Sequence, residues 1–162
     1  MTSCIGCRAQ IPDSDGPTHR YLGASPGCWA LFGEVMAREY GEWGYPRVHQ
    51  HTVDAYCVQH PGQPSPQTIQ SLIVHLASLH FMLERGQTAA QSIAMMGKLT
   101  RARLPFTWLT PPPSLGALTI VDVAAARTQA EHEALVVAWA RSAFAAWAPH
   151  HDAVKRWLAA VG

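Results

Sequence analysis

The sequence predicts an all-α fold, a single-domain helical bundle of about six helices. Helix-capping residues recur along the chain, and apolar residues repeat at helical spacing, while no stretch sustains the alternating pattern of a strand. The length of 162 residues and the hydrophobic content of 48% fit one domain with its own core. We therefore expect residues 1–162 to form one domain, with an irregular, zinc-tethered segment 1–24 and a helical bundle over 25–162.

Three helices are expected in the first half of the bundle, and a proline marks the start of each. Ser25–Pro26 and Ser65–Pro66 place a capping hydroxyl before a proline at the first helical position, where its missing N–H does no harm. Pro46 repeats the proline signal after a short turn. The predicted helices run over 26–40, 46–60 and 66–85. Because the loop between the first two is short, we expect them to be antiparallel.

Capping boxes mark two further helix starts. In a capping box, the side chain of a threonine and that of a residue three positions later each accept a hydrogen bond from the other's backbone N–H. The two boxes are Thr88 with Gln91 and, in a looser form, Thr119 with Asp122. The helix after Thr88 is expected to stop at Pro105. The helix after Thr119 is expected to continue without a break to residue 147. A final segment should run from 149 through 157.

Two segments are not expected to be helical. Segment 1–24 is rich in proline and glycine and has few apolar anchors, so it needs an external tie, such as a metal ion, to become ordered. Loop 105–118 contains Pro111–Pro113, which favour extended or polyproline geometry. Phe106 and Trp108 of this loop either wall a pocket or plug one end of the core.

Soft metal ligands gather in the first 60 residues of the chain. Cys4-x-x-Cys7 is a spacing at which one tight turn directs two sulfurs at the same ion, and Cys28 and Cys57-x-x-His60 follow. In the reducing cytoplasm, thiols stay free or bind metal more often than they form disulfides. Zinc is therefore the predicted cofactor. A redox dithiol and unlinked thiols are the alternatives.

Helix geometry helps to choose four ligands among the five candidates. In an antiparallel hairpin, Cys28 lies roughly 18 Å before the turn and level with His60, so these two side chains can meet. His49 lies roughly 16 Å from His60 along its helix and cannot share the ion. We predict a closed structural site, with Cys57 as the reserve ligand. The four predicted ligands are Cys4, Cys7, Cys28 and His60.

A second group of polar residues surrounds His49. At helical spacing, His49 and Tyr56 share a narrow stripe of their helix, which should face other helices. The next helix runs back and brings His75 near the level of His49, so His49, Thr52 and His75 are expected to converge. Asp54 lies on a different side of its helix and is a weaker member of the group.

Two interpretations of these histidines remain open. In the functional one, His49 and His75 form a general acid/base pair or part of a second, open metal site, with His132 as a possible third ligand. Tyr56 and Trp108 would then line the pocket. In the structural one, they are buried histidines with hydrogen-bond partners.

Charge and hydropathy exclude some partners. The net charge is +1 and no basic run occurs, so the sequence shows no electrostatic footprint for nucleic acid. No apolar stretch approaches the roughly 20 residues of a membrane span, and no secretory signal precedes Cys4. We expect a cytoplasmic protein without nucleic-acid or membrane partners. The sequence does not specify a small-molecule or protein partner.

Four motifs recur together in the first half of the chain. They are Cys4-x-x-Cys7, Ala24-Ser-Pro-Gly-Cys28-Trp29, Val48-His49, and Thr52-Val-Asp-Ala-Tyr56 followed by Gln59-His60-Pro61. This combination resembles a family of small bacterial proteins of uncharacterised function. The similarity spans most of the chain. It implies that the metal and pocket residues are a family signature, and it implies no particular reaction.

The sequence thus favours a zinc-binding helical protein with a structural Cys3His site. One alternative is a metal- or histidine-dependent hydrolase or transferase that uses a bundle pocket around His49 and His75. The other is a partner-binding module that uses the Pro-rich loop.

Overall fold

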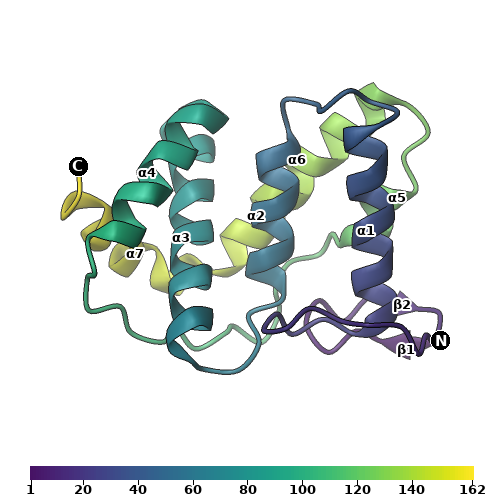
Figure 1. The fold of residues 1–162 in the computed structure, drawn as a ribbon, viewed down its shortest axis with the longest axis horizontal. Coiled ribbons are helices and arrows are strands. Elements are labelled where there is room, and N and C mark those ends of the chain that lie inside the picture. Colours follow the sequence, from purple (N-terminus) through teal and green to yellow (C-terminus); the bar gives the residue numbers. More distant parts are fainter.

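Seven α-helices and one short β-hairpin make up the chain, which a computed structural model describes over residues 1–162 (Figure 1). The predicted all-α class is confirmed. The strands are β1 (Thr2–Ser3) and β2 (Gln10–Ile11), which pair antiparallel with Thr2 opposite Ile11. The helices are α1 (Pro26–Tyr40), α2 (His49–Gln59), α3 (Pro66–Leu83), α4 (Ala89–Arg101), α5 (Ile120–Ala124), α6 (Gln129–Ala146) and α7 (His151–Ala159), with a 3-10 turn over Ala148–His150 before α7.

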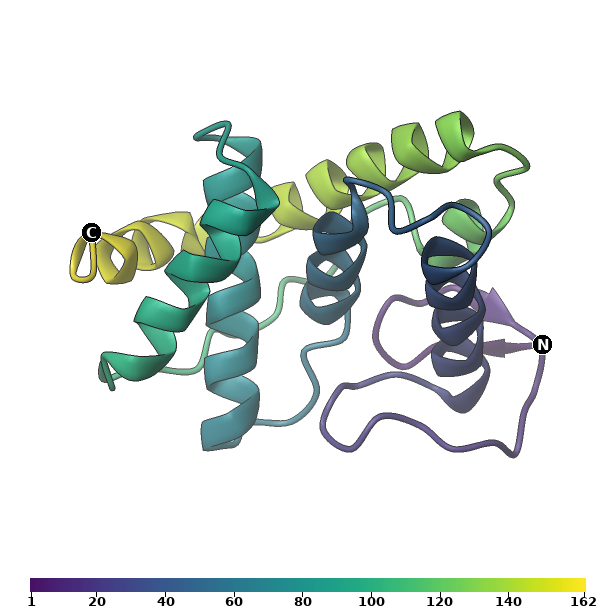
Figure 2. The same cartoon turned by 45° about the horizontal axis from the view of Figure 1, so that its top comes forward.

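Helices α1 to α4 stand side by side, and α6 crosses behind them (Figure 1). Turning the molecule shows α6 running along the row and α7 continuing towards α4 (Figure 2). Helix α2 packs against both α3 and α6, and α5 packs against α1. The β-hairpin lies at the foot of α1, so the two chain termini are at opposite ends of the molecule.

One apolar core links the helices, and it also fixes the end of α2. Leu72, Leu76 and Leu79 of α3 are buried in this core, as are Trp139 and Trp147. The two indoles donate hydrogen bonds to the last turn of α2. Trp139 Nε1 bonds Gln59 Oε1 at 2.8 Å, and Trp147 Nε1 bonds the carbonyl oxygen of Val58 at 3.0 Å. None of the helices combines the length and hydropathy needed to cross a bilayer.

Most helix starts agree with the sequence predictions. The Ser65 side chain accepts from the Thr68 N–H, and Thr88 with Gln91 forms the complete capping box. Helix α2, however, begins at His49 and not at Pro46. Tyr45 has a φ of 59°, and the carbonyl of Pro46 accepts from the His49 N–H in a turn at 3.0 Å. This turn delays the helix by three residues.

The single long helix expected over 119–147 is wrong. The chain leaves helix after Ala124, and Thr128 caps a new one by accepting from the Glu131 N–H. Arg38 of α1 stabilises the break, since its guanidinium donates to the carbonyl oxygens of Ala124 at 3.0 Å and Ala126 at 2.6 Å. A cation from another helix therefore satisfies carbonyls that a continuous helix would have paired internally.

The two segments expected to be irregular also differ in detail. Segment 1–24 contains the β-hairpin, whose strands are too short to show a period in the sequence. Loop 105–118 forms neither helix nor strand. Its Phe106 packs edge-on against Trp157, with ring centroids 5.3 Å apart, and Trp108 packs half-buried against the core. These contacts match the interpretation in which the two aromatic residues plug the core.

Candidate metal centre

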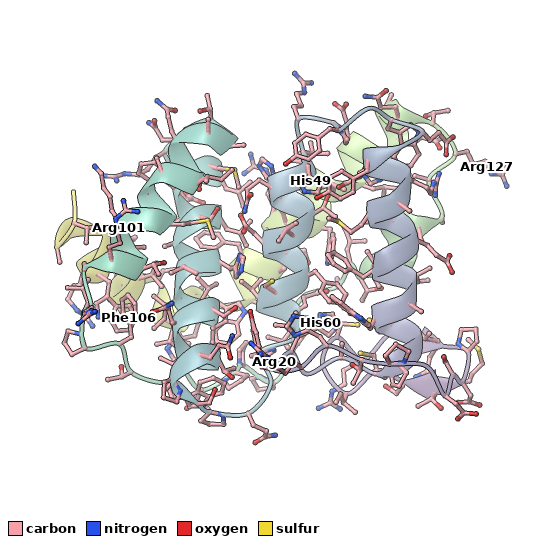
Figure 3. All side chains as sticks on the ribbon, in the orientation of Figure 1. Arg20, His49, His60, Arg101, Phe106 and Arg127 are labelled. Atoms are coloured by element: carbon pink, nitrogen blue, oxygen red, sulfur yellow. The ribbon has the colours of Figure 1, made fainter.

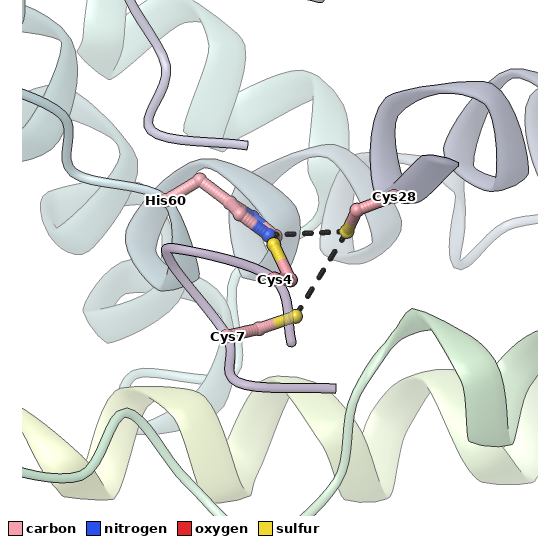
Figure 4. Close-up of side chains that lie close together, drawn as sticks. All are labelled: Cys4, Cys7, Cys28 and His60. Atoms are coloured by element: carbon pink, nitrogen blue, oxygen red, sulfur yellow. Dashed lines mark hydrogen bonds between the residues drawn. The ribbon is translucent and has the colours of Figure 1, made fainter. Parts of the chain in front are cut away.

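Three separate segments bring three cysteines and one histidine to one point at the foot of α1 and α2. The ligand atoms of the four residues lie within 4.8 Å of one another, and all four residues are buried. The sulfurs and the imidazole point towards a common centre (Figure 4). The residues are Cys4, Cys7, Cys28 and His60.

Cys4 and Cys7 lie in the turn of the β-hairpin. The Cys4 N–H donates to the carbonyl of Ala9 at 2.8 Å, and the Arg8 N–H donates to the carbonyl of Cys4 at 3.1 Å. Arg8 has a φ of 66°, in the left-handed region, so the chain reverses sharply after Cys7. The short strands hold this turn closed and turn both sulfurs inward.

Cys28 and His60 come from the ends of two neighbouring helices. Cys28 is the third residue of α1, after Pro26, and His60 immediately follows α2. Cys28 Sγ lies 3.3 Å from His60 Nε2. The Gly23 N–H donates to the His60 carbonyl at 3.1 Å, so the chain before α1 is attached to the end of α2. His49 lies at the other end of α2 (Figure 3).

The ring of His60 is oriented as in a metal ligand. Its Nδ1 bonds the carbonyl oxygen of Tyr56 at 2.7 Å, so this nitrogen carries the proton and leaves Nε2 to face the sulfurs. Metal-binding histidines characteristically donate their other N–H to such an acceptor. Tyr56 also stacks on the imidazole, with centroids 4.0 Å apart, and its hydroxyl donates to Cys28 Sγ at 3.6 Å. Tyr56 therefore supports the metal centre and does not join a histidine pocket.

The spacing of the donors fits a tetrahedral ion. Zinc–sulfur bonds of about 2.3 Å give sulfur–sulfur edges of about 3.8 Å in a tetrahedron. The Cys7 and Cys28 sulfurs are 3.9 Å apart. Three thiolates and one imidazole are also a typical closed zinc ligand set. The four residues could therefore hold a metal ion.

Electrostatics favour a cation at this point. Hydrogen bonds with Cys28 and Cys7 lower the pKa of the Cys4 thiol, while hydrogen bonds with Cys4 and Cys7 raise that of Cys28. Burial lowers the pKa of His60, but Cys4 and Cys7 outweigh it and raise the value to about 9. In this buried cluster, the ionisation of one thiol therefore opposes the ionisation of the next. A bound cation removes that conflict because it stabilises every thiolate at once.

Cys57, the reserve ligand, is not among the four gathered residues. It is half-buried, whereas the Cys28 side chain is completely buried. Both Cys28 and Cys57 were compatible with the sequence because each can reach the level of His60. The rotation of α2 decides between them, since it presents Tyr56 to the cluster and directs Cys57 elsewhere.

His49 belongs to a buried cluster centred on Glu39 of α1, a residue that the sequence interpretation missed. Glu39 Oε2 bonds His49 Nδ1 at 2.7 Å, and Oε1 bonds His132 Nε2 at 2.6 Å and the Thr52 hydroxyl at 2.5 Å. Glu39 falls on the apolar stripe of α1, four residues after buried Val35. A charged residue at a core position of a helical stripe was the available signal.

His75 belongs to a different cluster, centred on Asp54. Its Nδ1 bonds Asp54 Oδ1 at 2.7 Å, and Ser78 of the same helix donates to Asp54 Oδ2. The expected convergence of His49, Thr52 and His75 is therefore corrected. The first two share Glu39, and His75 pairs with the aspartate that the sequence ranked as the weaker member.

A surface pocket of about 610 Å³ opens beside the metal centre. Its walls include Gly6 of the hairpin turn, Pro61, and Pro111–Pro113 of the loop, together with Arg8 and Arg20 and no acidic residue. Trp108 is not part of its lining. The partner-binding alternative for the Pro-rich loop concerns this surface and stays a prediction.

One protein-family model matches this chain. A family model described as "Family of unknown function (DUF5946)" matches residues 2–148. The match includes the four gathered ligands and every helix up to α6. Comparison with curated proteins and with solved structures gives no match.

Proposed function

This chain belongs to DUF5946, a family of unknown function, and we propose that its Cys3His cluster holds a structural zinc ion. The observation that carries the proposal is the closed set of four buried donors from three segments of the chain. Structural zinc sites use four protein ligands, whereas catalytic sites keep one position for water or substrate. With four protein ligands, a tetrahedral ion here would have no coordination position open to water or substrate.

The ion would fasten the hairpin to the helices. Cys4 and Cys7 come from the N-terminal hairpin and Cys28 from α1, all three within the buried core, and the completely buried His60 follows α2. When four ligands from different segments share one ion, the free energy of metal binding contributes directly to folding. The zinc would therefore order the N-terminal segment and hold α1 beside the end of α2.

Metal content and proteolysis test this role together. Protein purified without added metal should contain one zinc per chain, and His60→Ala should lose it. Cys57→Ser is the matched control, since it removes a neighbouring thiol outside the cluster, and it should keep its zinc. Chelation should lower the melting temperature. It should also speed trypsin cleavage after Arg8 and Arg20, which are exposed on the surface but lie in backbone that the ion would hold rigid, whereas cleavage after the exposed Arg127 in the α5–α6 connection serves as the internal reference.

Three results would contradict the proposal. They are wild-type protein without zinc, unchanged melting after chelation, and equal zinc retention in His60→Ala and Cys57→Ser. Zinc retained in the wild type but no stability change on its removal would show binding without a structural role.

A further inference from the structure

The pocket of about 610 Å³ beside the metal centre is built from segments that are far apart in the sequence. They are the hairpin turn with Arg8, the strip 20–23 before α1, the connection 61–65 that leads into α3, and segment 111–115 of the Pro-rich loop. The volume is within the range of small-molecule sites in proteins. The pocket therefore has the dimensions of a site for a small organic molecule.

The charged residues of this pocket are both arginines. Arg8 and Arg20 line it together with no aspartate or glutamate, and neither guanidinium forms an ion pair with a carboxylate. Arg20 extends to the first turn of α3, where it donates to the neutral Gln67 Oε1 at 3.4 Å. The N-terminus of α3, which Ser65 caps, adds the positive end of an 18-residue helix to the same wall. The pocket therefore carries a local excess of positive charge in a chain whose net charge is only +1.

The Pro-rich loop supplies an apolar wall. Proline has no backbone N–H, so Pro111–Pro113 offer ring surfaces and carbonyl oxygens only. Hydrogen bonds fix the loop on both sides of this run. His150 Nε2 donates to the Thr110 carbonyl at 2.8 Å. Gln59 Nε2 donates to the Leu115 carbonyl at 2.9 Å. A ligand in the pocket therefore meets positive charge and a fixed apolar surface together.

The wall formed by strip 20–23 is held in place by its own contacts. The ring nitrogen Nδ1 of His19 accepts from the N–H groups of Tyr21 at 3.2 Å and Leu22 at 3.1 Å. Gly62, with a φ of 69°, packs against this strip so closely that an added methyl group would overlap the Tyr21 carbonyl oxygen. A preformed site loses little binding free energy to ordering. These walls therefore suit a ligand that offers few contacts of its own.

Two guanidinium groups without carboxylate partners suit a phosphate better than a carboxylate. A phosphate monoester carries about 1.5 to 2 negative charges at neutral pH and has three acceptor oxygens, so it can pair with both arginines. A carboxylate carries one charge and forms its bidentate pair with a single arginine. The proline rings beside the arginines favour a phosphate that is attached to an apolar, flat organic group over free phosphate.

We propose that this pocket binds small organic phosphates. Arg8 and Arg20 pair with the phosphate oxygens, and Pro111–Pro113 pack against the organic part of the ligand. No histidine, cysteine or carboxylate lines the pocket, so we expect the ligand to be bound without chemical change. The pocket also uses none of the four gathered metal ligands.

Isothermal titration calorimetry with 1-naphthyl phosphate tests this site in the purified chain. We expect saturable binding, at least about tenfold tighter than that of inorganic phosphate or 1-naphthylacetate, because each of these lacks one of the two kinds of contact. Arg8→Gln and Arg20→Gln should each weaken binding at least about tenfold, the size of a lost hydrogen bond to a charged group. Arg101→Gln is the matched control. It removes the same charge from the end of α4, away from Arg20, and should bind like the wild type (Figure 3).

Protection from arginine modification gives a second test that needs no variant. Phenylglyoxal reacts with exposed guanidinium groups, and peptide mass spectrometry measures the rate at each arginine. With 1-naphthyl phosphate at about ten times its Kd, Arg8 and Arg20 should react about tenfold more slowly, because only the unbound molecules are open to the reagent. The rate at Arg101 should not change. Equal protection of all three arginines, no saturable binding by the wild type, unchanged binding in either pocket variant, or equally tight 1-naphthylacetate would overturn the proposal.

Zinc content measured on the same preparations keeps the two proposals distinct. Protein that contains zinc and does not bind 1-naphthyl phosphate would contradict only the phosphate site. Protein that binds 1-naphthyl phosphate and contains no zinc would contradict only the structural ion.

Discussion

At the residue scale, three histidines in this part of the molecule have different surroundings because of the partner of one ring nitrogen. His49 and His75 each place Nδ1 against a carboxylate, at 2.7 Å in both cases. His60 instead places Nδ1 against the Tyr56 carbonyl and turns Nε2 to the thiols. A carboxylate holds a proton on the ring, and a carbonyl leaves the opposite nitrogen available to a metal.

Gly6 gives a residue-scale prediction about the metal centre. A methyl group at this position would overlap the carbonyl oxygen of Gly23 and come within 2.5 Å of His60 Cδ2. Gly6→Ala should therefore push the hairpin turn away from His60. Zinc affinity should fall at least about tenfold, which is the size of the loss when a residue that orients a metal ligand is changed. Competition with a chromophoric chelator measures this change.

Gly33→Ala is the control for that prediction. Gly33 is inside α1, and nothing lies within 4 Å of an added methyl group. Alanine should stabilise the helix by about 0.5–1 kcal/mol and leave zinc affinity unchanged. If both variants bind zinc like the wild type, Gly6 does not hold the turn against His60.

At the scale of elements, α5 and α6 show how a side chain from a distant helix ends a helical run. Thr119 and Thr128 both act as caps, so local signals permit either one long helix or two short ones. Arg38 decides between them by bonding the carbonyls of Ala124 and Ala126. It also lies over the Trp43 ring, 4.2 Å from the centroid, which fixes its position.

Arg38→Lys should therefore destabilise the protein although it keeps the charge. A lysine has one ammonium group and cannot bond two carbonyls in the fork geometry of arginine. We expect a loss of about 2 kcal/mol in the free energy of unfolding, measured with urea, from the lost charged hydrogen bonds. Arg47→Lys is the comparison, because Arg47 is 89% exposed in its ion pair with Glu133, and it should change stability by less than about 0.5 kcal/mol. Similar effects of the two substitutions would show that Arg38 does not stabilise the break.

At the scale of the whole molecule, the Glu39 cluster joins three helices. Glu39 belongs to α1, His49 and Thr52 to α2, and His132 to α6. Burial raises the pKa of Glu39, but hydrogen bonds from His132, Thr52 and His49 lower it by more, so the net pKa is below its ordinary value of 4.5. The ionised carboxylate is therefore part of what holds α1 and α6 against α2.

This cluster predicts a specific loss of stability in acid. Because the pKa of Glu39 is lower in the folded chain, the unfolded chain takes up the proton first as the pH falls. The stabilising contribution of the carboxylate is then complete above pH 4.5, the ordinary value, and is lost as the pH falls through the folded-state pKa. At neutral pH, Glu39→Gln should cost about 3 kcal/mol, since it breaks a buried charged pair.

Urea unfolding of wild type and Glu39→Gln over a pH series isolates the effect of Glu39, because any acid-induced change at the Cys3His cluster is common to both proteins. The stability difference between the two should be constant near neutral pH and shrink below pH 4.5. Glu34→Gln replaces an exposed glutamate of the same helix and should show no such difference. A stability difference that does not change with pH would show that the Glu39 charge is not responsible.

The local features of the fold could be read from the sequence. Capping residues and prolines act on backbone groups within about four residues, so Ser65–Pro66 and Thr88 with Gln91 marked real helix starts. The four gathered ligands were also predictable, because an antiparallel helix pair sets the level of Cys28 against His60. The two-residue strands were not, since a period cannot appear in so short a segment.

The sequence by itself determined the helical class, most helix starts and the residues of the Cys3His cluster. Only the tertiary structure decided where α6 begins, that Glu39 receives His49, and that Asp54 receives His75. The physical reason is the range of the interactions. Caps and spacing depend on neighbours in the chain, whereas the partner of a buried side chain depends on the rotation and crossing of helices, which residues far apart in the sequence set by packing together.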